Sequence, residues 1–309
     1  MDRVKLPLVF ITFLGIALLL CCCTTSSPTP VSSAEFAEYF GMAPPGLSPE
    51  LFAPGILPPE GGMAHSFPAF SPDGSEVYFS TYFPDQEPRV DVIMFLEWRG
   101  DAWSSAQVAS FSGEFNDNWP WFSPDGDRLY FSSQRSQDGS GDVEEYGLWY
   151  VERVEGGWSS PRQIAAPADF GRDEGPIYVA AVFPGGYGDM DIYRLEYVDG
   201  MYMMPENLGP MVNTEAEEYG PCVARDESYL IFSRYEDVGG RSVDLYVSFQ
   251  QEDGTWSEAQ NMGERIEAFR GGRFAGLSPD GRYLFFVAEG GEAIYWVDAE
   301  VVEQFRPGE

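Results

Sequence analysis

Short apolar runs separated by tight polar turns recur along this chain at nearly even intervals. Four copies of one unit begin at Phe70, Phe122, Val223 and Leu277, and the second reads Phe122-Ser-Pro-Asp-Gly-Asp-Arg-Leu-Tyr-Phe131. The Ser/Ala positions of the four copies, 71, 123, 224 and 278, are separated by 52, 101 and 54 residues. Because the middle interval is almost two periods, we expect a fifth, degenerate copy between the second and the third.

Each copy predicts four short antiparallel strands. The Pro-Asp-Gly turn joins the first two, because proline presets φ and glycine accepts the positive φ of a hairpin turn. A third run follows, such as Val243-Asp-Leu-Tyr246, and a fourth begins with an aromatic-Ser pair such as Trp256-Ser257. Four strands in about 50 residues make one propeller blade. The sequence therefore predicts an all-β fold, a β-propeller of five four-stranded antiparallel blades.

The degenerate copy is assigned by aligning Gly175-Pro-Ile-Tyr-Val179 with Gly220-Pro-Cys-Val-Ala224, the first strand of the next copy. A shortened hairpin then places Ala181-Val-Phe183 where Leu230-Ile-Phe232 stands in that copy. In this interpretation the third and fourth runs of the degenerate copy are intact.

The last copy lacks its fourth strand. The segment Leu51-Phe-Ala-Pro-Gly-Ile-Leu57 lies where such a strand could be supplied from the N-terminal side. Pairing strands from both ends of the repeat array removes two open sheet edges, so we predict closure of the ring by this N-terminal strand. A sixth blade built from residues 35 to 62 is the alternative.

The N-terminus has the composition of an export signal. Arg3 and Lys5 precede an apolar stretch over residues 6–20, and Cys21, Cys22 and Cys23 follow. A cysteine directly after the apolar stretch resembles the lipobox of bacterial lipoproteins, although Leu20 replaces the usual small residue. We expect a signal peptide over 1–23 with lipidation at Cys21, a flexible tether over 24–48 and one propeller domain over 49–309. An ordinary signal peptide or an uncleaved anchor is the alternative.

The charge balance excludes some partners. Fifty acidic residues oppose 18 basic ones, a formal net charge of −32, which argues against binding nucleic acid or anionic lipid headgroups. Membrane contact is then expected only through the N-terminal lipid anchor. Of the four cysteines, only Cys222 lies in the propeller segment, so no disulfide can form within that segment.

The repeats support a resemblance to a known family. Ser-Pro-Asp-Gly followed by an apolar-Tyr-Phe-Ser run, then Asp-Ile/Leu-Tyr, Trp-Ser and Asn-Leu-Gly, resembles the WD40-like PD40 repeats. Such repeats form the propeller of TolB-type periplasmic proteins and of many bacterial envelope lipoproteins. The resemblance implies a propeller over roughly residues 50–300 and an exported, lipid-anchored location in the bacterial cell envelope, and propellers of this family mostly bind proteins. We also expect the protein to be a monomer.

The candidate binding residues come from lining up the loops that enter each first strand. Counting six residues back from the repeat positions gives His65, Asp117, Asp173, Glu218 and Gly272; five back gives Ser66, Asn118, Glu174, Tyr219 and Arg273. These side chains differ between blades while the turns repeat, which is typical of a binding face on a fixed framework. We expect a polar, mostly acidic rim at His65, Asp117, Asn118, Asp173, Glu174, Glu218 and Arg273.

Two functions are compatible with such a rim. The first is a non-enzymatic scaffold that binds a protein or glycan partner of the envelope. The alternative is a secreted carbohydrate-active hydrolase in which Asp117, Asp173 and Glu218 act as acid and base. A single histidine supports neither a zinc site nor a Ser-His-Asp triad, so we expect no metal, no cofactor and no assigned catalytic residue.

Other recurring residues are expected to be structural. Asp91, Asp191 and Asp244 stand at the head of the third run, and their repetition favours hydrogen bonds between blades. The segments 138–142 and 186–191 loosely resemble calcium loops but lack the alternating oxygen ligands and closing glutamate of such a site.

Overall fold

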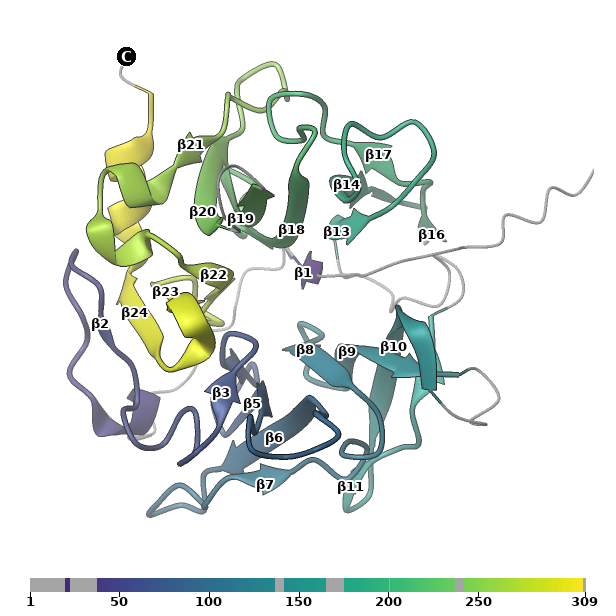
Figure 1. Ribbon diagram of the computed structural model, residues 1–309, viewed down its shortest axis with the longest axis vertical. Helices are drawn as coiled ribbons and strands as arrows, with labels where there is room; N and C mark the ends of the chain where they lie inside the picture. Colours follow the sequence, from purple (N-terminus) through teal and green to yellow (C-terminus); the bar gives the residue numbers. More distant parts are fainter. Residues whose placement is uncertain are drawn as a thin grey trace, which may run out of the picture.

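The computed structural model describes residues 20–22, 38–136, 142–164, 175–199, 201–236 and 242–307. In these ranges the chain forms five antiparallel sheets of four or five strands, arranged around one axis as the blades of a β-propeller, and one two-stranded sheet (Figure 1). The predictions of an all-β fold and of five blades are confirmed. None of the helices in the described part of the chain has the length and apolarity needed to cross a membrane.

Each blade is an antiparallel sheet of short strands. Blade 1 contains β3 (Met63–Ala64), β4 (Ala69–Phe70), β5 (Glu76–Tyr82), β6 (Val92–Glu97) and β7 (Gln107–Val108). Blade 2 contains β8 (Asp117–Phe122), β9 (Arg128–Arg135), β10 (Asp142–Val154), β11 (Gly157–Trp158) and β12 (Arg162–Gln163). Blade 3 contains β1 (Leu20–Cys22), β13 (Ile177–Ala181), β14 (Asp191–Leu195) and β17 (Glu206–Asn207), next to the hairpin of β15 (Tyr197–Val198) and β16 (Met201–Tyr202).

Blade 4 contains β18 (Glu217–Val223), β19 (Tyr229–Glu236), β20 (Ser242–Phe249) and β21 (Gln260–Asn261). Blade 5 contains β22 (Arg273–Leu277), β23 (Tyr283–Val287), β24 (Ile294–Asp298) and β2 (Glu50–Leu51). Short 3₁₀ helices connect these strands: η1 (Glu38–Gly41), η3 (Met262–Glu264), η4 (Glu267–Phe269), η5 (Glu289–Gly291) and η6 (Ala299–Phe305).

The Ser-Pro-Asp-Gly segment forms the turn between the first and second strands, as predicted. In blade 1 the Ser71 Oγ donates to Asp73 at 2.7 Å and accepts from the Glu76 N–H at 2.9 Å, while Gly74 adopts a φ of +74°. Blades 2 and 5 repeat these side-chain bonds. The turn therefore closes with its own side chains and leaves both strands free to pair.

The N-terminal strand closes the ring. β2 pairs antiparallel with β24, with Leu51 opposite Tyr295, and the Phe52 N–H donates to the Ile294 oxygen at 2.8 Å. Phe52 is buried against the first and last blades. The predicted closure is confirmed, and residues 38–62 contribute η1 and β2 rather than a sixth sheet.

Blade 3 differs from the predicted alignment. Val179 of β13 lies opposite Tyr193 of β14, as Phe232 of β19 lies opposite Tyr246 of β20. β13 is thus the second strand of its blade, and the alignment of residues 175–179 with the first strand of blade 4 is wrong. All five side chains of β13 are buried, because the two faces of its sheet pack against blades 2 and 4.

The innermost place of blade 3 is taken by β1, which comes from the predicted signal segment. Leu20 lies opposite Val179, and Cys21 lies opposite Tyr178. Figure 1 places β1 near the middle of the ring. In this state the backbone of Cys21 pairs with the propeller.

Candidate functional site

Four blades place one residue at the same register position of the first strand. The His65 N–H donates to the Ser80 oxygen at 2.9 Å, and Asn118 and Tyr219 lie opposite Ser132 and Ser233. In blade 5, Arg273 lies opposite Val287. This register position carries a histidine, an asparagine, a tyrosine and an arginine.

The count of six residues back misaligns blade 1, where His65 lies level with Asn118 and not with Asp117. Five positions separate Ala64 from Ala69 in blade 1, whereas four separate Asp117 from Trp121 in blade 2, although their partners on the second strand are equally spaced. The first strand of blade 1 thus carries one extra residue. The true equivalents of Asp117 are Ala64, Glu218 and Gly272.

Asp117 is fully buried and fixed by an arginine. Arg135 donates to its carboxylate at 2.7 Å and to the Phe111 oxygen at 3.0 Å, and the Ser112 Oγ donates to the second carboxylate oxygen at 2.8 Å. The pair ties the loop that enters blade 2 to the first two strands of that blade.

Glu218 repeats this arrangement in blade 4. Arg234 donates to its carboxylate at 2.8 Å and to the Val212 oxygen at 2.9 Å, and Thr214 donates to the same carboxylate through its N–H and its hydroxyl. Burial raises the pKa of the Asp117 and Glu218 carboxyls, and the paired guanidinium groups oppose that rise. Both carboxylates are engaged inside the protein and are not exposed to a ligand.

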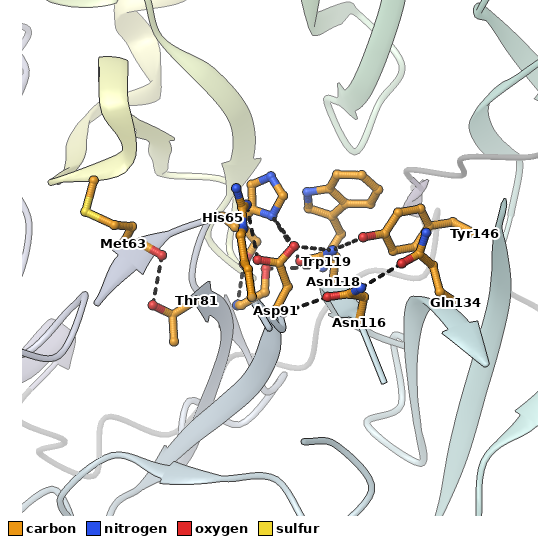
Figure 2. Close-up of polar contacts among 12 residues, drawn as sticks. Met63, His65, Thr81, Asp91, Asn116, Asn118, Trp119, Gln134 and Tyr146 are labelled. Atoms are coloured by element: carbon orange, nitrogen blue, oxygen red, sulfur yellow. Dashed lines mark hydrogen bonds and ion pairs between the residues drawn. The ribbon is translucent and has the colours of Figure 1, made fainter. Parts of the chain in front are cut away.

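His65 is part of a polar network between blades 1 and 2 (Figure 2). Its Nδ1 lies 3.1 Å from the Asn118 Oδ1 and 3.2 Å from the Asp91 Oδ2. Because both oxygens are acceptors, Nδ1 carries the proton and Nε2 is the nitrogen left for another partner. The Asn118 amide donates in turn to Asp91 at 3.2 Å and to the Tyr146 hydroxyl at 3.0 Å.

The charge of Asp91 is stabilised by this network. Burial alone would raise the pKa of Asp91, but hydrogen bonds from His65 and Asn118 and the charge of Arg89 hold it below its ordinary value. Burial also raises the pKa of Tyr146 to about 12, so its hydroxyl stays protonated. The Asp91 carboxylate accepts from Asn118 of blade 2, which supports the expected role of Asp91 in joining blades, and the Asp117 N–H donates to the backbone oxygen of Asp91 at 2.9 Å.

Two aromatic residues beside this register position have a left-handed backbone. Trp119 has a φ of +52° and Phe274 a φ of +54°, a conformation that costs a non-glycine residue roughly 1–2 kcal/mol. Their N–H groups donate to serine hydroxyls of the preceding blade, Trp119 to Ser80 at 3.4 Å and Phe274 to Ser233 at 3.1 Å. Blade 4 carries Gly220, with a φ of +65°, at the same place.

The Phe274 ring joins the blades near the axis. Its centroid lies 5.2 Å from His65, 5.7 Å from Trp119 and 5.8 Å from Tyr219, so it touches blades 1, 2 and 4 from blade 5. A ring that contacts side chains of three other blades must lie close to their common axis. We call the following set the axial cluster: His65, Asn118, Trp119, Tyr219, Arg273 and Phe274.

Of the predicted rim residues, the structure gathers His65, Asn118 and Arg273 in the axial cluster. Asp173 and Glu174 lie outside the described residues. Sequence reasoning did not single out Trp119 and Phe274, although each directly follows a counted position. An aromatic residue after a variable position of the first strand is the signal that could have found them.

Within the described ranges, no group of three or more His, Cys, Asp or Glu side chains could hold a metal ion. At the segment 186–191 the Asp191 carboxylate accepts the N–H groups of Tyr187 and Gly188 at 2.7 and 3.1 Å. A carboxylate that faces backbone donors serves the loop itself. Residues 138–141 of the other segment lie outside the described ranges.

No family model matches the sequence, and no curated protein matches it. Solved structures similar to this chain include TolB from Acinetobacter baumannii, with a TM-score of 0.43 and 12% identity, covering 75% of this chain and 54% of TolB. An α-L-arabinofuranosidase from Lactobacillus brevis has a TM-score of 0.44 and 14% identity, covering 71% and 82%. The β-propeller domain of the Trilobed protease from Pyrococcus furiosus has a TM-score of 0.36 and 16% identity, covering 71% and 63%.

This chain thus spans about half the length of TolB. The neighbours include both TolB and enzymes, and at these identities the similarity concerns the β-propeller fold alone. The function has to be argued from the axial cluster itself.

Proposed function

We propose that this protein is a non-enzymatic binding scaffold that presents its axial cluster to a protein or glycan partner. The observation that carries the proposal is the shared register of His65, Asn118, Tyr219 and Arg273 in four blades. Asn118 is buried and positions its neighbours, whereas the other three side chains are partly exposed. A repeated backbone whose side chain changes from blade to blade lets several contacts be tuned without disturbing the sheets.

The chemistry of the cluster supports recognition. Trp119 and Tyr219 are each partly exposed, and Tyr219 combines an apolar ring with a hydroxyl group. Such side chains provide large, rigid contact area together with hydrogen bonds. The strained backbone of Trp119 and Phe274 is further support, because strain of this kind gathers at ligand-binding positions.

The proposal includes location in a bacterial cell envelope. An acyl chain on Cys21 would tether the propeller through residues 24–48, with the membrane contacted only by the lipid. Acylation at Cys21 requires β1 to leave β13, because a residue anchored in a membrane cannot also pair inside the ring. The axial edge of β13 would then be free in the mature protein.

No specific observation favours the hydrolase alternative. Asp117 and Glu218 are buried and each is bound by an arginine, at 2.7 and 2.8 Å. A general acid or base must instead reach a substrate within hydrogen-bond distance. Catalytic use of these two carboxylates would require both ion pairs to open.

The test measures binding of envelope glycans and purified envelope proteins to the full chain. We expect Tyr219→Ala combined with His65→Gln to weaken binding of a partner at least tenfold. The matched control is Arg99→Gln, which removes an exposed arginine paired with Glu97 on blade 1. Thermal unfolding of each variant separates loss of contact from loss of fold.

Two results would contradict the proposal. One is equal binding by the wild type and the double variant for every partner found. The other is turnover of a polysaccharide by the wild type that is lost in Asp117→Asn with the fold intact, which would favour the hydrolase.

A further inference from the structure

Arg273 differs from most arginines of this chain because its charge is not compensated by an acidic side chain. Among the described residues it forms no ion pair, and its Nε is buried without a hydrogen-bond partner. Carboxylates outnumber cations 50 to 18 in this chain, so acidic partners are abundant. The buried Nε cannot be reached from outside, but the Arg273 side chain as a whole is partly exposed. A guanidinium charge without a counter-ion can therefore bind an anionic ligand through its terminal nitrogens.

Arg273 is partly exposed, and its described neighbours include Phe274, Tyr219 and Gly291. Its guanidinium lies 5.5 Å from the centre of the Phe274 ring, and its charge acts on the neighbouring Tyr219, where it opposes the rise in pKa that burial causes. A Cβ built on Gly291 would lie 3.5 Å from the Arg273 Nη2 and 2.8 Å from the Ala64 oxygen. Gly291 therefore lets the loop of η5 lie against the guanidinium.

The same point of the ring carries a second polar side chain. His65 follows Ala64, and its ring centroid lies 5.2 Å from that of Phe274, the ring that Arg273 also contacts. Its Nδ1 is used by Asn118 and Asp91, which leaves Nε2 without a partner among the described residues. Asp91 itself is engaged by three groups: His65, Arg89 and Asn118.

The net charge restricts which carboxylate can approach. A polyanionic glycan would carry many like charges toward a protein of −32, and that repulsion would oppose its binding. A single carboxylate at the end of an otherwise basic peptide avoids this repulsion, because the basic side chains of the peptide are attracted to the negatively charged protein. A chain end also suits a site where four blades converge on one point.

We propose that Arg273 binds the C-terminal carboxylate of a basic peptide segment of the partner, an inference that rests on the proposed function. The planar guanidinium offers two parallel N–H donors that match a carboxylate. Trp119 and Tyr219 provide apolar surface for the last side chain of the peptide.

The test uses a pool of basic octapeptides with free C-termini and the same pool with amidated C-termini. Peptides retained by the immobilised full-length chain are quantified by mass spectrometry, and dissociation constants of the best are measured in solution. We expect free carboxylates to bind the wild type at least tenfold more tightly than the matched amides. Arg273→Gln should remove this difference, Arg273→Lys should restore part of it, and Arg99→Gln should leave it unchanged.

The outcomes separate the two proposals. Equal binding of free and amidated peptides, or discrimination that persists in Arg273→Gln, overturns the inference. Retention of no peptide also overturns it. Oligogalacturonides are tested in parallel as a polyanionic glycan, and tighter binding of these than of the peptides overturns the inference as well. In each case the proposal of a binding scaffold still holds if some partner binds the wild type and does not bind the Tyr219/His65 double variant. The Arg273 side chain forms no ion pair with described residues, so its variants should keep the unfolding midpoint of the wild type.

Discussion

Arg135 lies 2.7 Å from Asp117 in the interior of blade 2, and the pair between Arg234 and Glu218 repeats this arrangement two blades away. In each blade the guanidinium also binds a backbone oxygen of the loop that enters the first strand. Both pairs are almost completely buried. They hold the entry loops that bring Asn118 and Tyr219 to the axis, so the framework beneath the axial cluster is electrostatic as well as apolar.

We predict that Asp117→Asn destabilises the fold by about 3 kcal/mol or more, because it leaves the Arg135 charge buried without a counter-ion. The free energy of unfolding in urea measures the loss. The control is Glu97→Gln, which breaks an exposed pair with Arg99 and should cost less than about 1 kcal/mol. Similar losses in the two variants would mean that the buried pair is not a structural clamp.

A second prediction concerns Glu227, which occupies the turn position that glycine fills in blades 1, 2 and 5. Its φ is +58°, unfavourable for a side chain, yet its carboxylate binds Arg194 of blade 3 at 2.9 Å and accepts from the Tyr178 hydroxyl. The departure from Ser-Pro-Asp-Gly in this copy thus joins two blades at the expense of backbone strain.

The two effects of Glu227 can be separated by a double-mutant cycle. Glu227→Gly relieves about 1 kcal/mol of strain but loses the contact with Arg194. In an Arg194→Ala background the contact is already absent, so Glu227→Gly only relieves the strain. The change in the free energy of unfolding caused by Glu227→Gly should therefore be at least about 0.5 kcal/mol more favourable in that background than in the wild type. Urea unfolding of the four proteins measures this coupling. Additive effects would show that the ion pair contributes nothing to the joint between blades.

The turns could be predicted from sequence because their causes are local, and the closure of the ring because one copy of the repeat is incomplete. Proline, aspartate and glycine fix the hairpin by φ and by side-chain bonds within a few residues. The missing fourth strand of the last copy likewise pointed directly to Leu51 as its replacement. The turns need no knowledge of the neighbouring blade.

The axial cluster could be predicted only in part, because the register depends on pairing across strands. One extra residue before Ala69 shifts the strand register of His65 by one position relative to the other blades. Counting residues along the sequence does not reveal this shift. The acidic residues Asp117 and Glu218 looked like rim residues because their arginines come from the second strand. An arginine within a run of apolar and serine residues, as at Arg234, was the available sign of a buried partner.

The turn aspartates predict a specific pH dependence. Burial alone would raise the pKa of Asp280, but bonds from the Ser278 hydroxyl and from the Arg282 N–H and side chain hold it below its ordinary value. A carboxyl whose pKa is lowered by folding stabilises the fold above its unfolded pKa, about 3.9. That contribution is lost as the pH falls below this value and through the lower pKa of the folded state.

We therefore expect Asp280→Asn to lower the free energy of unfolding by about 1 kcal/mol at pH 7, a value reduced for partial exposure. The stabilities of the variant and the wild type should become equal as the pH falls toward about 2. Urea unfolding at several pH values between these limits measures the difference. Asp101→Asn, at an exposed position of blade 1, is the control and should stay parallel to the wild type. A constant gap between Asp280→Asn and the wild type at all pH values would contradict the assignment.

The last prediction concerns the anchor. Changing Cys21, Cys22 and Cys23 together to serine removes every thiol that a lipid could modify in this segment. The protein should then move from the membrane fraction of cells to the soluble fraction, where residues 20–22 are free to pair with β13. The control is Cys222→Ala, which alters a buried cysteine of the propeller and should leave the protein with the membranes. Fractionation with detection of the attached lipid by mass shift gives the readout. A wild type that is soluble without any lipid would refute the lipoprotein hypothesis, and the pairing of Cys21 inside the ring would then describe the working state of the protein.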